Sequence, residues 1–182
     1  GALRDGAVPY SLVARLLRSA LSPQTATQLD DSQSSPLTLL RARLARWLPA
    51  TEREVVPSFL LQAVAPSDEP NDPTAHAAVK DARKDGRRMH DHIRRAFLCW
   101  LAAECAHAPV LLALDDLHWS DPLSVGLIDD ALRELRRAPL FVLALAGPEI
   151  RKAFPKLWFG QPLQELPLKP LSRRACERMI RH

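Results

Sequence analysis

Two adjacent carboxylates, Asp115 and Asp116, stand at the end of a short apolar run and are the residues best suited to chemistry. The run at 110–114 reads VLLAL, and the chain continues as DDLHWSDP. Five apolar residues ending in two acids predict a strand buried on both faces. The carboxyl ends of such strands are where open α/β sheets bind ligands. Neighbouring carboxylates need a cation, and hydrated Mg²⁺ held together with substrate phosphates fits them.

An acid pair of this kind can divide the work of phosphoryl transfer. One carboxylate would orient the magnesium shell, and the other would position or deprotonate the attacking water. The alternative interpretation is that the pair only ends a strand and caps a turn. His118 is a candidate for sensing a nucleotide, with a purely local hydrogen bond as its alternative, and Trp119 is expected to pack.

The elements next to the acids predict a parallel β-α-β unit. Asp121 and Pro122 open a helix as N-cap and first-turn residue. A second continuous apolar run, LFVLALA, follows at 140–146. Strand, helix and strand of this length place 110–115 and 140–146 side by side as parallel strands. The stretch LQELPL at 163–168 is expected to form a further strand.

The first part of the chain is expected to be mainly helical. Apolar residues at helical spacing predict a helix over 12–21. The polar stretch 22–36 predicts a loop, and Ser35 is the expected N-cap of a second helix that starts at Pro36. A short apolar piece at 59–64 precedes a linker at 65–75.

The longest helix is expected over 87–107, directly before the first strand. Its apolar stripe consists of Met89, Ile93, Phe97, Trp100 and Leu101. His90 and His92 lie two residues apart and therefore face different sides of the helix, so they are not expected to share a metal. A final helix is expected after Ser172, which would cap it.

The composition indicates one cytoplasmic domain without a membrane span. The chain has 182 residues, is 47% hydrophobic and only 5% aromatic, which suits helices packed on a parallel sheet. Its net charge of +4 comes from scattered arginines. With no helix-turn-helix pattern, stacking platform or zinc spacing, direct nucleic-acid binding is not expected. The three cysteines have no C-x-x-C spacing and are expected to be free thiols.

The stretch at 110–122 resembles the Walker B segment of the STAND class of bacterial signal-transduction ATPases, which are related to AAA proteins and carry an LDDLHW-type motif. Four other stretches resemble further parts of that module in the same order. They are GAVPYSLVARLL at 6–17 (after the second strand), RRMHDHIRRAFLCWLA at 87–102 (the helix before Walker B), LFVLALAGPEI at 140–150 (the sensor strand) and LPLKPLS at 166–172 (the last strand and its exit).

The resemblance implies an α/β fold: a three-layer, P-loop NTPase-like parallel sheet with flanking helices, incomplete in its first strands and with a helical insertion. Residues 1–75 would be the helical region after the absent second strand, with its linker, and 76–182 the Walker B and sensor part. Mg²⁺ and ATP are implied for the intact module. Asp115 would hold Mg²⁺ through water, Asp116 would act on the attacking water as the catalytic residue, and His118 would join both acids in contacting the nucleotide.

Two departures from the family pattern bear on activity. No G-x-x-x-x-G-K-[ST] phosphate loop occurs, and none of the six glycines lies in a glycine-rich loop. Relatives commonly carry Arg at the position of Gly147, where it could sense the γ-phosphate, and Gly147 cannot do so. Either hydrolysis is slow or another arginine serves; Arg151 lies four residues on but is not the expected substitute. The chain is therefore expected to be a fragment lacking the Walker A loop.

The function implied is part of an ATP-binding, slowly hydrolysing switch that controls output domains. Those domains, fused or associated, would be kinases, cyclases or DNA-binding domains. The alternative is a catalytically inactive pseudo-ATPase fragment that acts as a protein-interaction domain. The sequence upstream of Gly1 would separate the two, because an intact phosphate loop supports the switch and a degenerate one supports the alternative.

Overall fold

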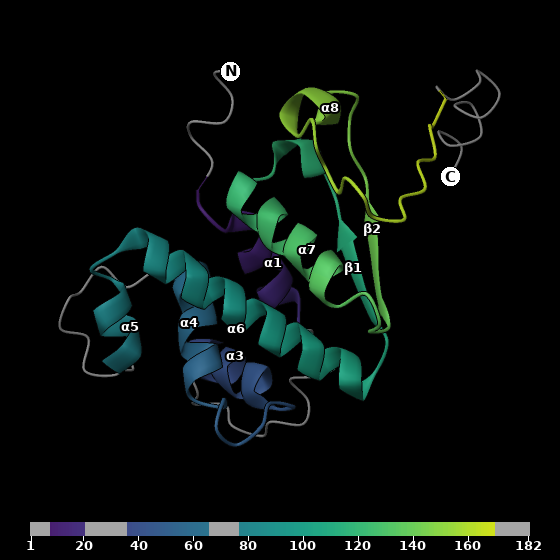
Figure 1. Ribbon diagram of the computed structural model, residues 1–182. Helices are drawn as coiled ribbons and strands as arrows, with labels where there is room; N and C mark the ends of the chain where they lie inside the picture. Colours follow the sequence, from purple (N-terminus) through teal and green to yellow (C-terminus); the bar gives the residue numbers. More distant parts are fainter. Residues whose placement is uncertain (1–7, 21–35, 66–76, 170–182) are drawn as a thin grey trace, which may run out of the picture.

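The computed structural model describes residues 8–20, 36–65 and 77–169 as an α/β arrangement (Figure 1). Its elements, in chain order, are α1 (Ser11–Ser19), α3 (Pro36–Ala45), α4 (Val55–Val64), α5 (Ala77–Ala82), α6 (Gly86–His107), β1 (Val110–Leu114), the 3-10 turn η1 (Leu117–Trp119), α7 (Pro122–Glu134), β2 (Leu140–Ala144) and α8 (Ile150–Ala153).

The two strands form the predicted parallel pair. Val110 lies opposite Leu140, and the register continues without a break to Leu114 opposite Ala144. The connection between the strands is α7, as the β-α-β pattern predicts. Asp121 caps α7 by accepting the backbone N–H of Ser124, and Pro122 is its first residue. A two-stranded parallel sheet with flanking helices is consistent with a partial P-loop NTPase-like fold.

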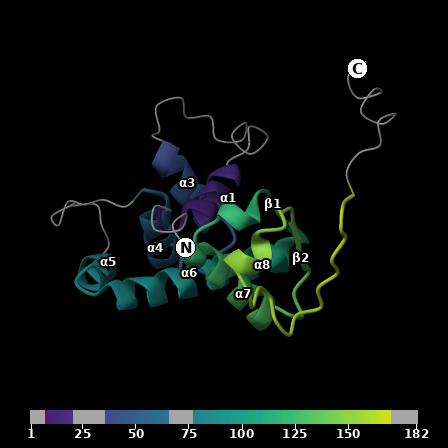
Figure 2. The same cartoon turned by 90° about the horizontal axis from the view of Figure 1, so that it is seen from above.

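The prediction that both faces of the strands are buried is wrong for the described residues. Leu112 and Leu114 are buried against the helices, whereas Leu111 is 60% exposed and Phe141 is 66% exposed. Alternate residues of a strand point to opposite faces, and Figures 1 and 2 show the helices gathered on one side of the sheet. A third layer is therefore not seen within residues 8–20, 36–65 and 77–169.

The stretch 163–168 is not a strand, contrary to the sequence-based prediction. Its backbone is irregular and pairs with neither β1 nor β2. Leu166 is 73% exposed and Leu168 is 87% exposed. Pro167 also lacks the N–H that a central strand would donate. Alternating Leu residues are thus insufficient here without a strand to pair with.

The core lies among the helices, with α6 at its centre. Helix α6 packs on α4, α5 and α7, while α4 also contacts α1 and α3. Fully buried side chains from these helices meet there; they include Leu17, Leu44, Leu60, Phe97, Leu101 and Ile128. The apolar piece 59–64 is the second half of α4 rather than an isolated segment. Helix α6 ends at His107 as predicted, two residues before Pro109.

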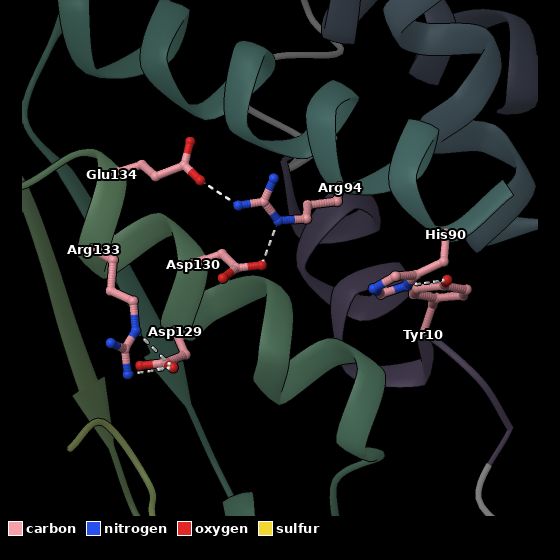
Figure 3. Close-up of polar contacts among 7 residues, drawn as sticks. All are labelled: Tyr10, His90, Arg94, Asp129, Asp130, Arg133 and Glu134. Atoms are coloured by element: carbon pink, nitrogen blue, oxygen red, sulfur yellow. Dashed lines mark hydrogen bonds and ion pairs between the residues drawn. The ribbon is translucent and has the colours of Figure 1, made fainter. Parts of the chain in front are cut away.

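Ion pairs join α6 to α7 on the surface of this core (Figure 3). The guanidinium Nε of Arg94 donates to Asp130 Oδ2 at 2.6 Å, and Arg94 also pairs with Glu134. Helix α1 ends at Ser19, two residues before its predicted end at Leu21. Other predictions fall outside the described residues: most of the loop at 22–36 with Ser35 as N-cap, the linker beyond Ala65, and the helix after Ser172.

Candidate functional site at the carboxyl end of the sheet

Asp115 and Asp116 lie directly after β1, and both are exposed to solvent. Asp115 Oδ1 accepts the backbone N–H of Asp116 at 2.9 Å. Asp116 has a left-handed backbone, with φ 52° and ψ 40°. This conformation costs a non-glycine residue about 1–2 kcal/mol, and such strain is found preferentially at functional turns. The structure therefore brings the two predicted acids together on a sharply shaped turn.

The acidic turn is bonded to the end of β2. The N–H of Leu145 donates to the carbonyl of Leu114 at 2.8 Å, and the N–H of Leu117 donates to the carbonyl of Leu145 at 3.0 Å. Leu117 is also buried beneath the turn. Asp115 and Asp116 lie between these two bonds, so their backbone is fixed relative to both strands.

His118 bonds to a residue far along the chain rather than locally. Its Nδ1 accepts the backbone N–H of Gly147 at 3.0 Å. Because Nδ1 is the acceptor, the proton of the neutral ring is on Nε2, which makes Nε2 a donor. Trp119 was expected to pack, and this is wrong: it is 61% exposed and contacts the ring of His118 at 5.3 Å between centroids. Sequence alone gave no signal for the link between His118 and Gly147.

Gly147 leaves room for two side chains at this edge of the sheet. A Cβ at this position would lie 2.6 Å from Glu149 Oε2 and 3.3 Å from His118 Nε2. Any larger residue would therefore displace one of them. Arg151, four residues after Gly147, is paired with Glu165 at 2.5 Å.

Asp121, buried at the start of α7, connects this edge of the sheet to the N-terminal segment. Its carboxylate accepts the N–H of Tyr10 and of Ser124, each at 2.9 Å, the hydroxyl of Ser11 at 3.1 Å and the N–H of Leu12 at 3.4 Å. Burial opposes the charge on Asp121, but the bonds from Ser124, Tyr10 and Leu12 together hold its pKa below the usual 3.8. Sequence reasoning identified only the local cap, because the other donors lie more than 100 residues earlier.

Tyr10 provides a direct test of this contact. Burial, reinforced by the negative charge of Asp121, raises the pKa of Tyr10 to about 12. A raised pKa means that folding favours the neutral phenol, so the stabilisation is complete below about pH 10 and is lost as pH rises towards 12. Tyr10 is the only tyrosine, so phenolate absorbance reports on it alone. We expect a midpoint near 12 in the native chain and near 10 in denaturant; equal midpoints would contradict the contact.

His90 and His92 of α6 do not form a pair of metal ligands. His90 Nδ1 lies 2.8 Å from the hydroxyl of Tyr10 (Figure 3), whereas the ring of His92 stacks on Phe59. Among the described residues, no group of three or more His, Cys, Asp or Glu side chains could hold a metal. The acid pair nevertheless suits a magnesium ion that takes most of its ligands from water and phosphate, because it offers exposed carboxylate oxygens.

No helix in the described parts of the chain has both the length and the apolar character needed to cross a membrane. In the same parts of the chain, Cys99 and Cys105 are free thiols, as expected, and burial raises the pKa of each.

Comparison with known proteins places the acid pair within a recognised domain. Residues 5–143 match the family described as AAA ATPase domain. Over 74 residues the chain is 30% identical to an uncharacterised protein of Rhizobium meliloti (strain 1021); this alignment covers 41% of the chain but 7% of that relative. No solved structure matches. Because the family match takes in most of the chain, with β1 and both acids, the protein belongs to the AAA ATPase domain family.

Proposed function

We propose that this chain is part of an ATP-binding, slowly hydrolysing regulatory switch, with Asp115 and Asp116 at its reactive edge. The observation that carries the proposal is the exposed acid pair at the carboxyl end of β1, bonded on both sides to the end of β2. Membership of the AAA ATPase domain family supports dependence on a nucleotide and, with it, on Mg²⁺. The bound ion would neutralise phosphate charge.

The two acids have different tasks in this proposal. Asp115 accepts one N–H at Oδ1 and has a second oxygen with which to accept from a water of the magnesium shell. Asp116, held at its left-handed turn, would orient the attacking water and accept its proton. His118 would donate from Nε2 to a phosphate oxygen, because its Nδ1 is occupied by Gly147. A neutral imidazole in place of an arginine gives weaker charge stabilisation, which favours slow turnover.

The same proposal covers the finer architecture. We infer a STAND-type module in which β1 is the Walker B strand, 76–182 the Walker B and sensor part, and 1–75 a helical region that includes an insertion. The exposed apolar face around Leu111 and Phe141 supports a third layer supplied by other parts of the protein. Kinase, cyclase or DNA-binding domains, fused or associated in the cytoplasm, would receive the signal.

A catalytically inactive interaction domain is the second candidate. Gly147 and the absence of a phosphate loop from these 182 residues favour it. Such a domain would keep the acid pair only as a strand end and turn. The two candidates differ in a measurable way, because only the switch requires the intact protein to bind Mg-ATP and hydrolyse it.

We expect the 182-residue chain by itself to bind Mg-ATP poorly. Most of the affinity for phosphates comes from the backbone N–H groups and the lysine of a phosphate loop, and neither is present here. Calorimetry of Mg-ATP into the chain is the measurement, with the intact protein titrated in parallel. Micromolar binding by the chain would show that an unrecognised phosphate site exists. Failure of the intact protein to bind would favour the inactive domain.

A further inference from the structure

A cavity of about 430 Å³ lies between α7 and the segment that ends at Trp158, and neither Asp115 nor Asp116 lines it. One wall is a single stripe of α7, formed by Pro122, Val125, Gly126 and Asp129, whose spacing places them on one helix face. The other wall is the run 153–158, which is mainly apolar. The volume is in the range of small-molecule sites, which are also mostly apolar with a few polar groups.

Gly126 leaves open space on the α7 wall of this cavity. It lies in the interior of α7, where glycine destabilises a helix by about 0.5–1 kcal/mol relative to alanine. A Cβ built on Gly126 meets no atom within 4 Å, so close packing does not require glycine here. Its backbone is also not in the positive-φ region. Neither close packing nor a positive φ therefore requires glycine here. The missing side chain does leave space for a ligand.

Both walls also contribute buried polar atoms that have no hydrogen-bond partner. They are Asp129 Oδ1 on α7 and the indole Nε1 of Trp158 on the opposite wall. Trp158 is 5% exposed and has a positive φ of 49°. Unpaired buried polar groups are costly and rare in native proteins, and strained backbone conformations cluster at functional sites. Both residues line the largely apolar cavity, but the two atoms are buried, so each side chain must rotate before its acceptor or donor can reach a ligand.

Arg133 bonds to both sides of the cavity and leaves Asp129 Oδ1 without a hydrogen-bond partner. Its guanidinium binds the other oxygen, Asp129 Oδ2, at 3.0 Å (Figure 3) and donates to the carbonyl of Phe159 at 3.3 Å. Arg133 already balances the charge of Asp129, and Lys156 adds a positive charge at the rim. A cationic ligand gains little from such a site, whereas a neutral N–H donor suits the remaining oxygen.

We propose that this cavity binds a small, neutral heteroaromatic molecule that donates an N–H to Asp129 and accepts a hydrogen bond from Trp158. The flat ring fills the space between the apolar run 153–158 and Gly126, and small side-chain rotations bring the two unpaired atoms to it. This site is separate from the acid pair and goes beyond the proposed ATPase function.

Three related bicyclic probes test the proposal on the full 182-residue chain. 7-Azaindole carries both an N–H donor and a ring-nitrogen acceptor, indole carries only the donor, and N-methylindole carries neither. The readout is the assigned indole N–H resonance of Trp158 in a titration. We expect 7-azaindole to shift this resonance and to bind about tenfold or more tightly than N-methylindole, the scale of one hydrogen bond to a charged group.

Two variants and a matched control locate the binding. Gly126→Leu fills the space and should weaken all three probes by at least about tenfold. Gly86→Leu, at another helical glycine with nothing within 4 Å of its Cβ, should change none of them. Asp129→Ala should weaken 7-azaindole and leave N-methylindole unchanged, which keeps the test decisive if Gly126→Leu does not fold. The proposal is overturned if Trp158 does not respond, if all three probes bind equally, or if folded Gly126→Leu binds normally.

Discussion

In the intact protein, Asp116→Asn slows ATP hydrolysis by about 100-fold or more while Mg-ATP affinity stays nearly unchanged. This is the usual scale for losing a positioned general base. The substitution keeps the size of the side chain and one acceptor oxygen, and asparagine tolerates the left-handed backbone that Asp116 adopts. The turn should therefore keep its shape, so that the loss falls on the chemical step. Single-turnover hydrolysis and equilibrium binding are measured on the same protein.

Asp115→Asn is expected to reduce Mg-ATP affinity more than it reduces the rate of hydrolysis. It removes a formal charge facing the magnesium shell, so Mg²⁺-dependent nucleotide binding weakens first. The two carboxylates are adjacent, and each change also alters the electrostatic surroundings of the other. This coupling blurs the separation without reversing it. Asp81→Asn is the control, because Asp81 is an exposed acid of α5 paired only at the surface with Lys84 and should affect neither quantity.

The contrary result would be informative. If Asp115→Asn and Asp116→Asn both match the parent in affinity and in turnover, the pair is a strand end and a turn cap. The inactive interaction domain would then be the better account of this chain.

Asp121→Ala should destabilise the folded chain by about 3–5 kcal/mol, the range for removing one partner from a buried charged network. The carboxylate is 2% exposed and receives bonds from Tyr10, Ser11, Leu12 and Ser124. Removing it leaves those donors without their acceptor, and α7 loses its cap. Urea unfolding is the measurement. Asp121→Asn should fall between the parent and the alanine variant, because its amide oxygen replaces only part of the acceptor set.

Asp85→Ala is a matched control for that experiment. Asp85 also caps a helix, α6, but it is exposed: its carboxylate accepts the N–H of Arg87 and forms a surface ion pair with Arg88 at 3.7 Å. Its loss should cost about 1 kcal/mol, the typical value for a helix N-cap. Equal destabilisation by the two alanine variants would show that the tertiary bonds of Asp121 contribute nothing.

The same carboxylate predicts a pH dependence in acid. Because the pKa of Asp121 is lower in the folded chain than its ordinary 3.8, its contribution is present above that value and is lost as pH falls below it. Asp121→Asn should weaken this dependence and should also lower the native titration midpoint of Tyr10, because the negative charge of Asp121 helps burial to raise that pKa to about 12.

Local patterns in the sequence predicted the elements that depend on local physics. The start of α7 at Pro122 and the parallel pairing of β1 with β2 are confirmed, because capping and apolar runs are read from neighbouring residues. The exposed face at Leu111 and the irregular 163–168 were mispredicted, because burial and strand formation depend on what lies alongside.

The residues of the candidate site divide in the same way. Asp115 and Asp116 were recognised from their place after an apolar run, and the structure puts them together on one turn. The bond from Gly147 to His118 and the bonds from residues 10–12 to Asp121 had no local signal. Such contacts depend on the path of the chain, which no short spacing rule encodes. The roles assigned to both acids and to His118 remain predictions.

The contact between Tyr10 and Asp121 also bears on how the chain folds in time. It joins residues 111 positions apart. Closing so long a loop has a large entropic cost, which must be met before the contact stabilises the chain. Helices such as α6 and the β1-α7-β2 unit need only nearby partners and can form earlier. The N-terminal segment should therefore dock late, so that losing this contact accelerates unfolding more than it slows folding.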